Sequence, residues 1–207
     1  MTESVDSILP LGTFIAYGLA GAFVLALVER IVPIVPSYGL FIFLGSTLAN
    51  NAWDLVPLII VTTLASTLSG IIWYGIGYLL GEERTHRAVV KYGKYVWLKE
   101  ELYLSLSQRY ERNAFIATFI GQTVPAVRVY LSLPAGILAL PLGTFSLAVF
   151  LGSAIWVGGF TAIGYGLNMF GWDPVIATII AVIALVIIEG GILLLIQRRR
   201  RRSQMQS

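Results

Sequence analysis

The sequence predicts an all-α integral membrane protein, with a single membrane domain over residues 1–207. The chain is 57% hydrophobic and only 12% charged, and its mean hydropathy of +0.82 is atypical of a soluble domain. Long uncharged stretches recur along it, of the length that crosses a bilayer as a helix. Two of these stretches are interrupted by proline and glycine, which favours an inverted repeat of two re-entrant helical hairpins.

The first transmembrane helix is expected at residues 11–30, where an uncharged run ends at Glu29 and Arg30. No basic segment precedes this run, so we expect it to be retained as a membrane helix and not cleaved as a signal peptide. Residues 55–81 form a second apolar run, rich in the small residues that let helices approach closely in lipid.

The two interrupted stretches are residues 31–53 and 113–138, each predicted to enter the membrane and return to the same side. Proline removes a backbone donor and clashes with the preceding helical turn. Broken backbone at membrane depth survives only where it lines a cavity or is buried in protein. The residues expected to break these hairpins are Pro33, Pro36, Pro125 and Pro134.

The remaining segments complete two similar halves. Residues 82–112 mix basic and aromatic side chains, which predicts an amphipathic helix lying in the membrane interface. Two further transmembrane helices are expected at 141–171 and 174–197, followed by a basic tail at 198–207. Each half therefore consists of a broken hairpin and a helix rich in small residues.

Topology follows from the placement of the basic residues. The arginine run in the tail should stay in the cytoplasm, and two spans before it return the segment 82–112 to the same side. Both termini are then cytoplasmic, and the two hairpins enter from opposite faces, as an inverted repeat requires. If residues 31–53 crossed the membrane fully, the N-terminus would lie outside instead.

Arg128 is the leading candidate for a binding residue. An arginine at membrane depth costs about 2.5–3.5 kcal/mol by insertion scales and is tolerated only when it faces water, a partner or a ligand. Its planar fork suits the bidentate recognition of phosphate. Arg128 lies beside Pro125 in the second broken segment, so we expect an anionic ligand there.

Glu29 is the candidate partner of Arg128, since an inverted repeat brings the two broken segments together. Burial disfavours a charged carboxylate, which suits Glu29 to proton coupling; a purely structural ion pair stays open as the alternative. Arg30 is expected to anchor the helix at the interface, and Glu189 to reach the cytoplasmic interface. Further hydrogen-bonding candidates for a head group are Gln122, Ser37, Thr123 and Tyr38.

Other functional classes find little support. The chain has no cysteine and a single histidine, His86, which disfavours metal or haem sites built on these ligands. No motif for a hydrolase or a nucleotide-binding loop occurs in a suitable context. We therefore expect no enzymatic activity, no metal or other cofactor and no nucleic-acid partner. Membrane lipids are the expected partners, and association into a homo-oligomer is left open.

From about Glu29 to about Gly171 the chain resembles the DedA family, also called the SNARE-associated Golgi protein or VTT-domain family. This resemblance implies an inner-membrane protein with two opposed re-entrant hairpins that moves lipid across the bilayer. Bacterial relatives are linked to undecaprenyl phosphate recycling or phospholipid flipping, in several cases with the proton-motive force, and eukaryotic relatives to lipid scrambling. The residues that carry the resemblance are Glu29, Pro33 to Ser37, Gly45, Tyr74 to Gly77, Gly81, Phe119 to Arg128, Ala135, Gly136, Phe145, Gly152, Trp156 and Gly164.

Three positions depart from the family pattern. Tyr38 stands where relatives usually carry a second acid, Gln122 where they carry an arginine, and Gly70 where many carry an aspartate. The expected function is transport of a phosphate-bearing lipid, such as the polyprenyl phosphate undecaprenyl phosphate, with proton coupling left open. The alternatives are a phospholipid flippase or scramblase, a non-transporting membrane scaffold, and a small-ion transporter.

Overall fold

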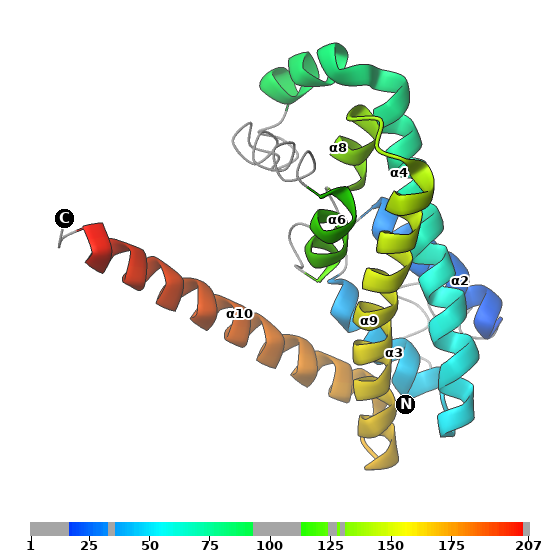
Figure 1. Cartoon of the computed structure of the whole chain (residues 1–207). Coiled ribbons are helices and arrows are strands. Elements are labelled where there is room, and N and C mark those ends of the chain that lie inside the picture. Colours follow the sequence, from blue (N-terminus) through cyan, green and yellow to red (C-terminus); the bar gives the residue numbers. More distant parts are fainter. Residues whose placement is uncertain (1–16, 33–35, 93–112, 124–127, 129–130, 205–207) are drawn as a thin grey trace.

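The computed structural model describes residues 17–32, 36–92, 113–123, 128 and 131–204, and the regular secondary structure of this part of the chain is all helical (Figure 1). Two long helices and several short ones make up the body, and a further long helix leads away from it. The helices are α2 (Leu19–Ile31), α3 (Ser37–Leu48), α4 (Ala52–Tyr92), α6 (Ala114–Gln122), α8 (Ser132–Ile137), α9 (Leu142–Met169) and α10 (Pro174–Gln204).

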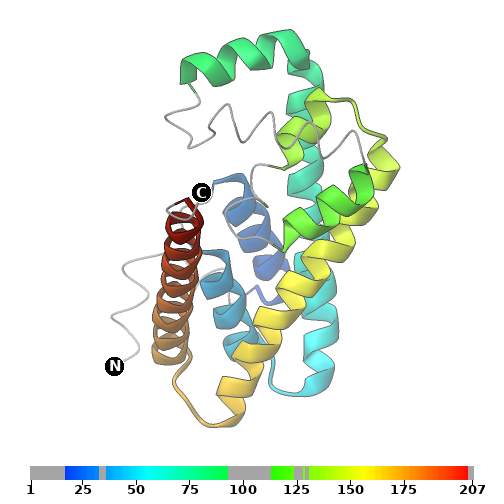
Figure 2. The same cartoon turned by 60° about the vertical axis from the view of Figure 1, so that its left-hand side comes forward.

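Among the described residues, two helices are long and apolar enough to cross a membrane. They are Ala52–Gly81 within α4, with 30 residues, and α9, with 28. A helix of 30 residues is about 45 Å long, more than the roughly 30 Å of a bilayer's hydrocarbon core. The two helices cross obliquely (Figure 2). Their bounds agree closely with the helices predicted at 55–81 and 141–171. At Gly81 the backbone takes φ 68° and α4 changes direction, a conformation that glycine adopts without steric cost.

The first broken segment is divided differently from the sequence prediction. We expected a whole hairpin within 31–53, whereas the described residues there form one helix, α3, and the break lies before it. Pro36 caps the start of α3, and no proline interrupts 37–48, so that stretch stays helical. The preceding helix α2 has 13 described residues, about 20 Å, and so forms the first arm of the broken unit.

The second broken segment consists of α6 and α8, with Arg128 between them. Asn113 caps α6, its side-chain oxygen accepting from the Ile116 N–H at 3.0 Å. Pro134, expected to break the hairpin, lies in the first turn of α8, where a missing N–H is tolerated. Pro33 and Pro125 lie outside the described residues.

The short helices pack both within and across the two halves of the chain, which are α2 to α4 and α6 to α9. Each first arm packs on the long helix of its own half, α2 on α4 and α6 on α9, while each second arm packs on the long helix of the other half, α3 on α9 and α8 on α4. Glycines make the exchanged contacts close: a Cβ on Gly45 or Gly164 would overlap the facing α9 or α3 carbonyl, and one on Gly77 or Gly136 the facing α8 or α4 carbonyl. Each half of the chain therefore contributes one short helix to the long helix of the other half.

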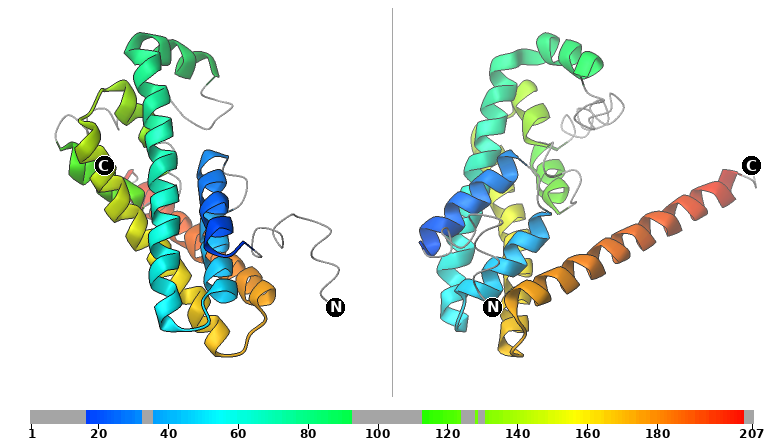
Figure 3. Two further views of the ribbon diagram at one scale, coloured as in Figure 1. Left: turned by 90° about the vertical axis from the view of Figure 1, so that its right-hand side faces the viewer. Right: turned by 180° about the vertical axis from the view of Figure 1, so that it is seen from behind.

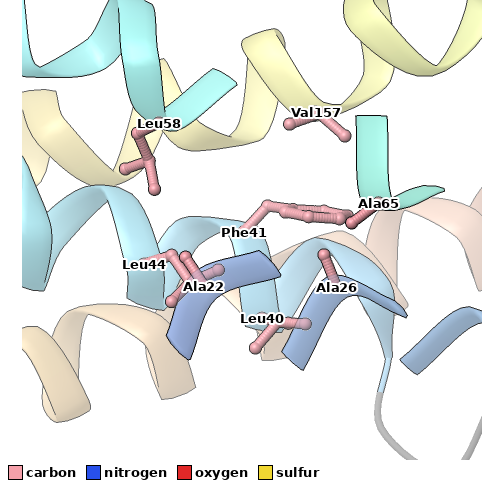
Figure 4. Close-up of a cluster of buried hydrophobic side chains, with 8 residues drawn as sticks. All are labelled: Ala22, Ala26, Leu40, Phe41, Leu44, Leu58, Ala65 and Val157. Carbon is pink, nitrogen blue, oxygen red and sulfur yellow. The ribbon is translucent and has the colours of Figure 1, made fainter. Parts of the chain in front are cut away.

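The core fills the space where these helices meet. Figure 4 shows one cluster, with alanines from α2, larger apolar side chains from α3, two residues from α4 and one from α9. A second cluster joins α4, α8 and α9 around Phe145 and Leu131. The clusters therefore hold the ends of the short helices in place between α4 and α9.

Helix α10 packs mainly against α3 and then extends away from the body (Figures 1 and 3). It is one continuous helix over the predicted span 174–197 and the following arginines, where we had expected a separate tail. Of the predicted interfacial segment 82–112, residues 82–92 are described and continue α4 as a helix, and 93–112 lie outside the described residues.

Candidate functional site

A cluster of buried polar side chains lies where the breaks in the two short-helix pairs meet. Glu29 and Arg30 end α2, Gln122 ends α6, Arg128 follows it, and Ser132 begins α8. All five are buried, with no more than 7% of their surface exposed. The long helices α4 and α9 flank the cluster, so it lies inside the body of the protein.

Glu29 and Arg128 form an ion pair, as the sequence analysis proposed. An Arg128 Nη2 lies 3.6 Å from a Glu29 Oε2, and both side chains are almost wholly buried. The Ser37 side chain, at the start of α3, hydrogen-bonds to Glu29. The Arg128 guanidinium also lies 4.9 Å from the centre of the Trp156 ring, a cation–π contact that fixes its plane.

Arg30 is buried, which overturns the expectation that it anchors the helix at the interface. Only 2% of its surface is exposed. Its Nη1 donates to Ser153 Oγ at 3.1 Å, and its Nη2 to Gln122 Oε1 at 2.6 Å. The sequence held a signal for this placement: Ala22, Ala26, Glu29 and Arg30 follow helical spacing, so the charged pair continues the small-residue face that packs inward.

Several donors in the cluster have no hydrogen-bond partner among the residues that the structure describes. They include Gln122 Nε2, Nε and Nη2 of Arg128, the Ser132 hydroxyl and the Trp156 indole N–H. Buried polar groups are almost always satisfied, and an unpaired buried donor costs about 1–3 kcal/mol. Donors outnumber acceptors in this set, so the cluster is suited to receive an anion.

The other predicted site residues lie around the cluster. The Tyr38 ring is buried and packs 5.9 Å from that of Phe160. The Thr123 side chain is exposed, and its hydroxyl donates to the Ile120 carbonyl at 2.7 Å, closing the last turn of α6. Pro36 is exposed, and the side chain of Glu189 lies outside the described residues.

Two residues that the sequence analysis did not propose for the site complete it, although Trp156 was named among those that carry the family resemblance. The Ser153 hydroxyl accepts a hydrogen bond from Arg30, and the Trp156 ring makes the cation–π contact with Arg128. They are three residues apart on α9, so they share one face and differ by about 4.5 Å along the helix axis. Only the tertiary structure, which brings Arg30 and Arg128 to this face of α9, reveals these contacts.

These features define a class: a helical membrane protein with two broken helical units and a buried, cation-rich centre between them. The VTT domain family matches residues 35–166, most of the chain, and the chain belongs to this family. The resemblance to the DedA family noted from the sequence is thereby confirmed.

Named relatives agree with a membrane location. The chain is 31% identical over 152 residues to undecaprenyl phosphate transporter A of Staphylococcus aureus, covering 73% of this chain and 75% of the relative. It is 28% identical to inner membrane protein YghB of Escherichia coli over 65% of this chain and 59% of the relative. It is also 30% identical to an alkaline phosphatase-like protein of Lactococcus lactis over 68% and 66%. No solved structure matches the chain.

Proposed function

We propose that this protein moves a phosphate-bearing lipid, a polyprenyl phosphate such as undecaprenyl phosphate, across the cell's inner (plasma) membrane. The observation that carries the proposal is the buried cluster, in which unpaired donors surround Arg128 at the meeting point of two broken helical units. The relative named undecaprenyl phosphate transporter A supports the choice of lipid.

Arg128 would hold the phosphate. Its Nε and one Nη have no hydrogen-bond partner within the described part of the chain, and together they present the fork that binds two oxygens of one phosphate. Trp156 keeps the guanidinium plane in place. Gln122 and Ser37 would add neutral hydrogen bonds to the head group, as would Ser132, whose hydroxyl is also unpaired.

Glu29 would couple lipid binding to a proton. A phosphate on Arg128 displaces Glu29 from its ion pair, and a buried carboxylate without a cation beside it is favoured in its neutral form. Binding of the lipid would thus draw a proton onto Glu29. Release of the lipid would restore the ion pair and return the proton.

The topology we propose has both termini in the cytoplasm and the two broken units entering from opposite faces. The reciprocal packing of α3 on α9 and α8 on α4 supports this arrangement, since each half supplies one arm to the other. Arg128 and Glu29 come from different halves, so movement of one half against the other would change the access of the site from one side to the other.

Reconstituted vesicles test the proposal. Vesicles containing the full chain are loaded with undecaprenyl phosphate, and an external phosphatase measures how fast the inner pool becomes accessible. We expect accessible phosphate to rise in vesicles with the protein and to depend on an imposed pH gradient. Movement of phosphatidylethanolamine but not of undecaprenyl phosphate would replace our choice of lipid with a phospholipid flippase. Absence of movement for every lipid would favour a scaffold.

A further inference from the structure

Arg30 is the most unusual residue of the cluster, because it is a second buried arginine beside Arg128. Its two described hydrogen bonds go to the neutral acceptors Ser153 and Gln122. The nearby carboxylate, Glu29, forms its ion pair with Arg128 and offsets the charge of Arg30 only through space. With Glu29 ionised, these three side chains therefore leave one positive charge uncompensated.

A buried charge without a counter-charge costs several kcal/mol. The packing around position 30 does not need a charged side chain. Arg30 and Arg128 also repel each other across the cluster. A glutamine or leucine at position 30 would fill the same space between α2 and α9 without these costs. The presence of Arg30 as a second buried cation is explained if an anion occupies the site during the transport cycle.

The geometry places the two cations side by side. Ser153 and Trp156, which hold them, lie on one face of α9, separated by about 4.5 Å along its axis. Arg30 also orients Gln122: because the arginine can only donate, it takes the amide oxygen and leaves the amide nitrogen as a free donor. The result is two guanidinium groups and a row of neutral donors over one small region.

Gly70 of α4 borders this region and keeps it free of negative charge. A Cβ at Gly70 would lie 3.9 Å from Arg30 Nη2, 3.4 Å from Ser132 Oγ and 3.2 Å from Val149 Cγ1, so the Val149 side chain must shift slightly to admit it. A carboxylate on that Cβ would reach Arg30 and neutralise it. With glycine at this position, the ligand itself is left to supply the counter-charge.

We propose that Arg30 is a specificity-determining residue that, together with Arg128, selects a phosphate monoester over a phosphodiester. The inference rests on the proposed function and names the chemistry of its substrate. A monoester carries about 1.5–2 negative charges at neutral pH, and a diester carries one. With Glu29 protonated in the lipid-bound state, Arg128 alone matches the diester charge, and the two arginines together match the monoester.

The test compares two lipids that differ by one charge, undecaprenyl phosphate and its methyl ester, binding to the purified full chain in nanodiscs of phosphatidylcholine. Wild-type protein should bind the monoester about ten- to hundredfold more tightly, the range for one additional charge-assisted hydrogen bond. Arg30→Gln should reduce this ratio to about threefold or less, because it weakens binding of the monoester more than binding of the methyl ester.

A matched pair at Gly70 keeps the test independent of how Arg30→Gln folds. Gly70→Asp leaves Arg30 in place and neutralises it, and should abolish the monoester preference. Gly70→Asn adds the same shape without the charge and should retain it. If Arg30→Gln and Gly70→Asp both keep the wild-type ratio, or if wild-type protein binds the two lipids equally, Arg30 does not select the substrate, while the proposed function stands. If wild-type protein binds neither lipid, the proposed function fails and the selectivity with it.

Discussion

Replacing Glu29 by glutamine tests the central ion pair and its coupling to protons. Glutamine keeps the shape of glutamate and one oxygen acceptor, but it cannot ionise. Arg128 then faces a neutral amide at the 3.6 Å position of the former carboxylate. We expect the variant to insert and fold, to be less stable, and to move lipid without responding to a pH gradient.

The size of the stability loss follows from the burial of the pair. Removing one partner of a buried ion pair costs about 3–5 kcal/mol, because the other charge is left uncompensated. The glutamine oxygen keeps a partial negative charge beside Arg128, and the contact with Trp156 is unchanged, so we expect about 2–3 kcal/mol. For a chain of this length, that lowers the thermal midpoint by about 4–12 °C.

A double-variant cycle separates pairing from generic damage. Glu29→Gln together with Arg128→Gln removes both charges, so its cost should be smaller than the sum of the two single costs by at least about 1 kcal/mol. Additive costs would mean that the two side chains do not interact in the folded protein.

Transport in vesicles with and without an imposed pH gradient measures the coupling. Glu189→Gln serves as a matched control, because it removes a carboxylate from α10, outside the cluster. We expect the control to keep most of the wild-type response and Glu29→Gln to lose it. A Glu29→Gln protein that responds fully to the gradient would refute the carboxylate's role in coupling. Wild-type transport without any response would indicate scrambling.

Three further outcomes are expected. Arg128→Ala should insert normally and lose transport, with Arg128→Lys restoring only part of it because lysine lacks the bidentate fork; wild-type transport by an inserted alanine variant would argue against phosphate binding there. Gly164→Ala should destabilise the protein by about 1–3 kcal/mol or more, because its Cβ meets an α3 carbonyl, whereas Gly166→Ala has open space and should be neutral or stabilising, as thermal unfolding in detergent would show. Cysteines introduced at Ser203 and Tyr95 should be labelled only from the cytoplasmic side, and labelling from opposite sides would break the inverted-repeat topology.

The sequence by itself determined the class of the protein and much of the candidate site. Apolar length predicted the two long helices, since about 20 apolar residues are needed to cross a bilayer. Proline marked the region of the first break, and Arg128 and Glu29 stood out because charge is costly at membrane depth. Their pairing followed from the repeat, which places corresponding segments of the two halves opposite each other.

Only the tertiary structure decided how the first broken unit is divided, which arms are exchanged, and where Arg30 lies. A small-residue face indicates that a helix packs closely, but it does not name the helix that packs against it. Ser153 and Gln122 are 123 and 92 residues from Arg30 in the chain. Ser153 attracts no notice from its local pattern, and Gln122 was expected to bind a head group, not Arg30. Whether an arginine near a helix end reaches out to the interface or turns inward depends on the partners that the packing of α6 and α9 supplies.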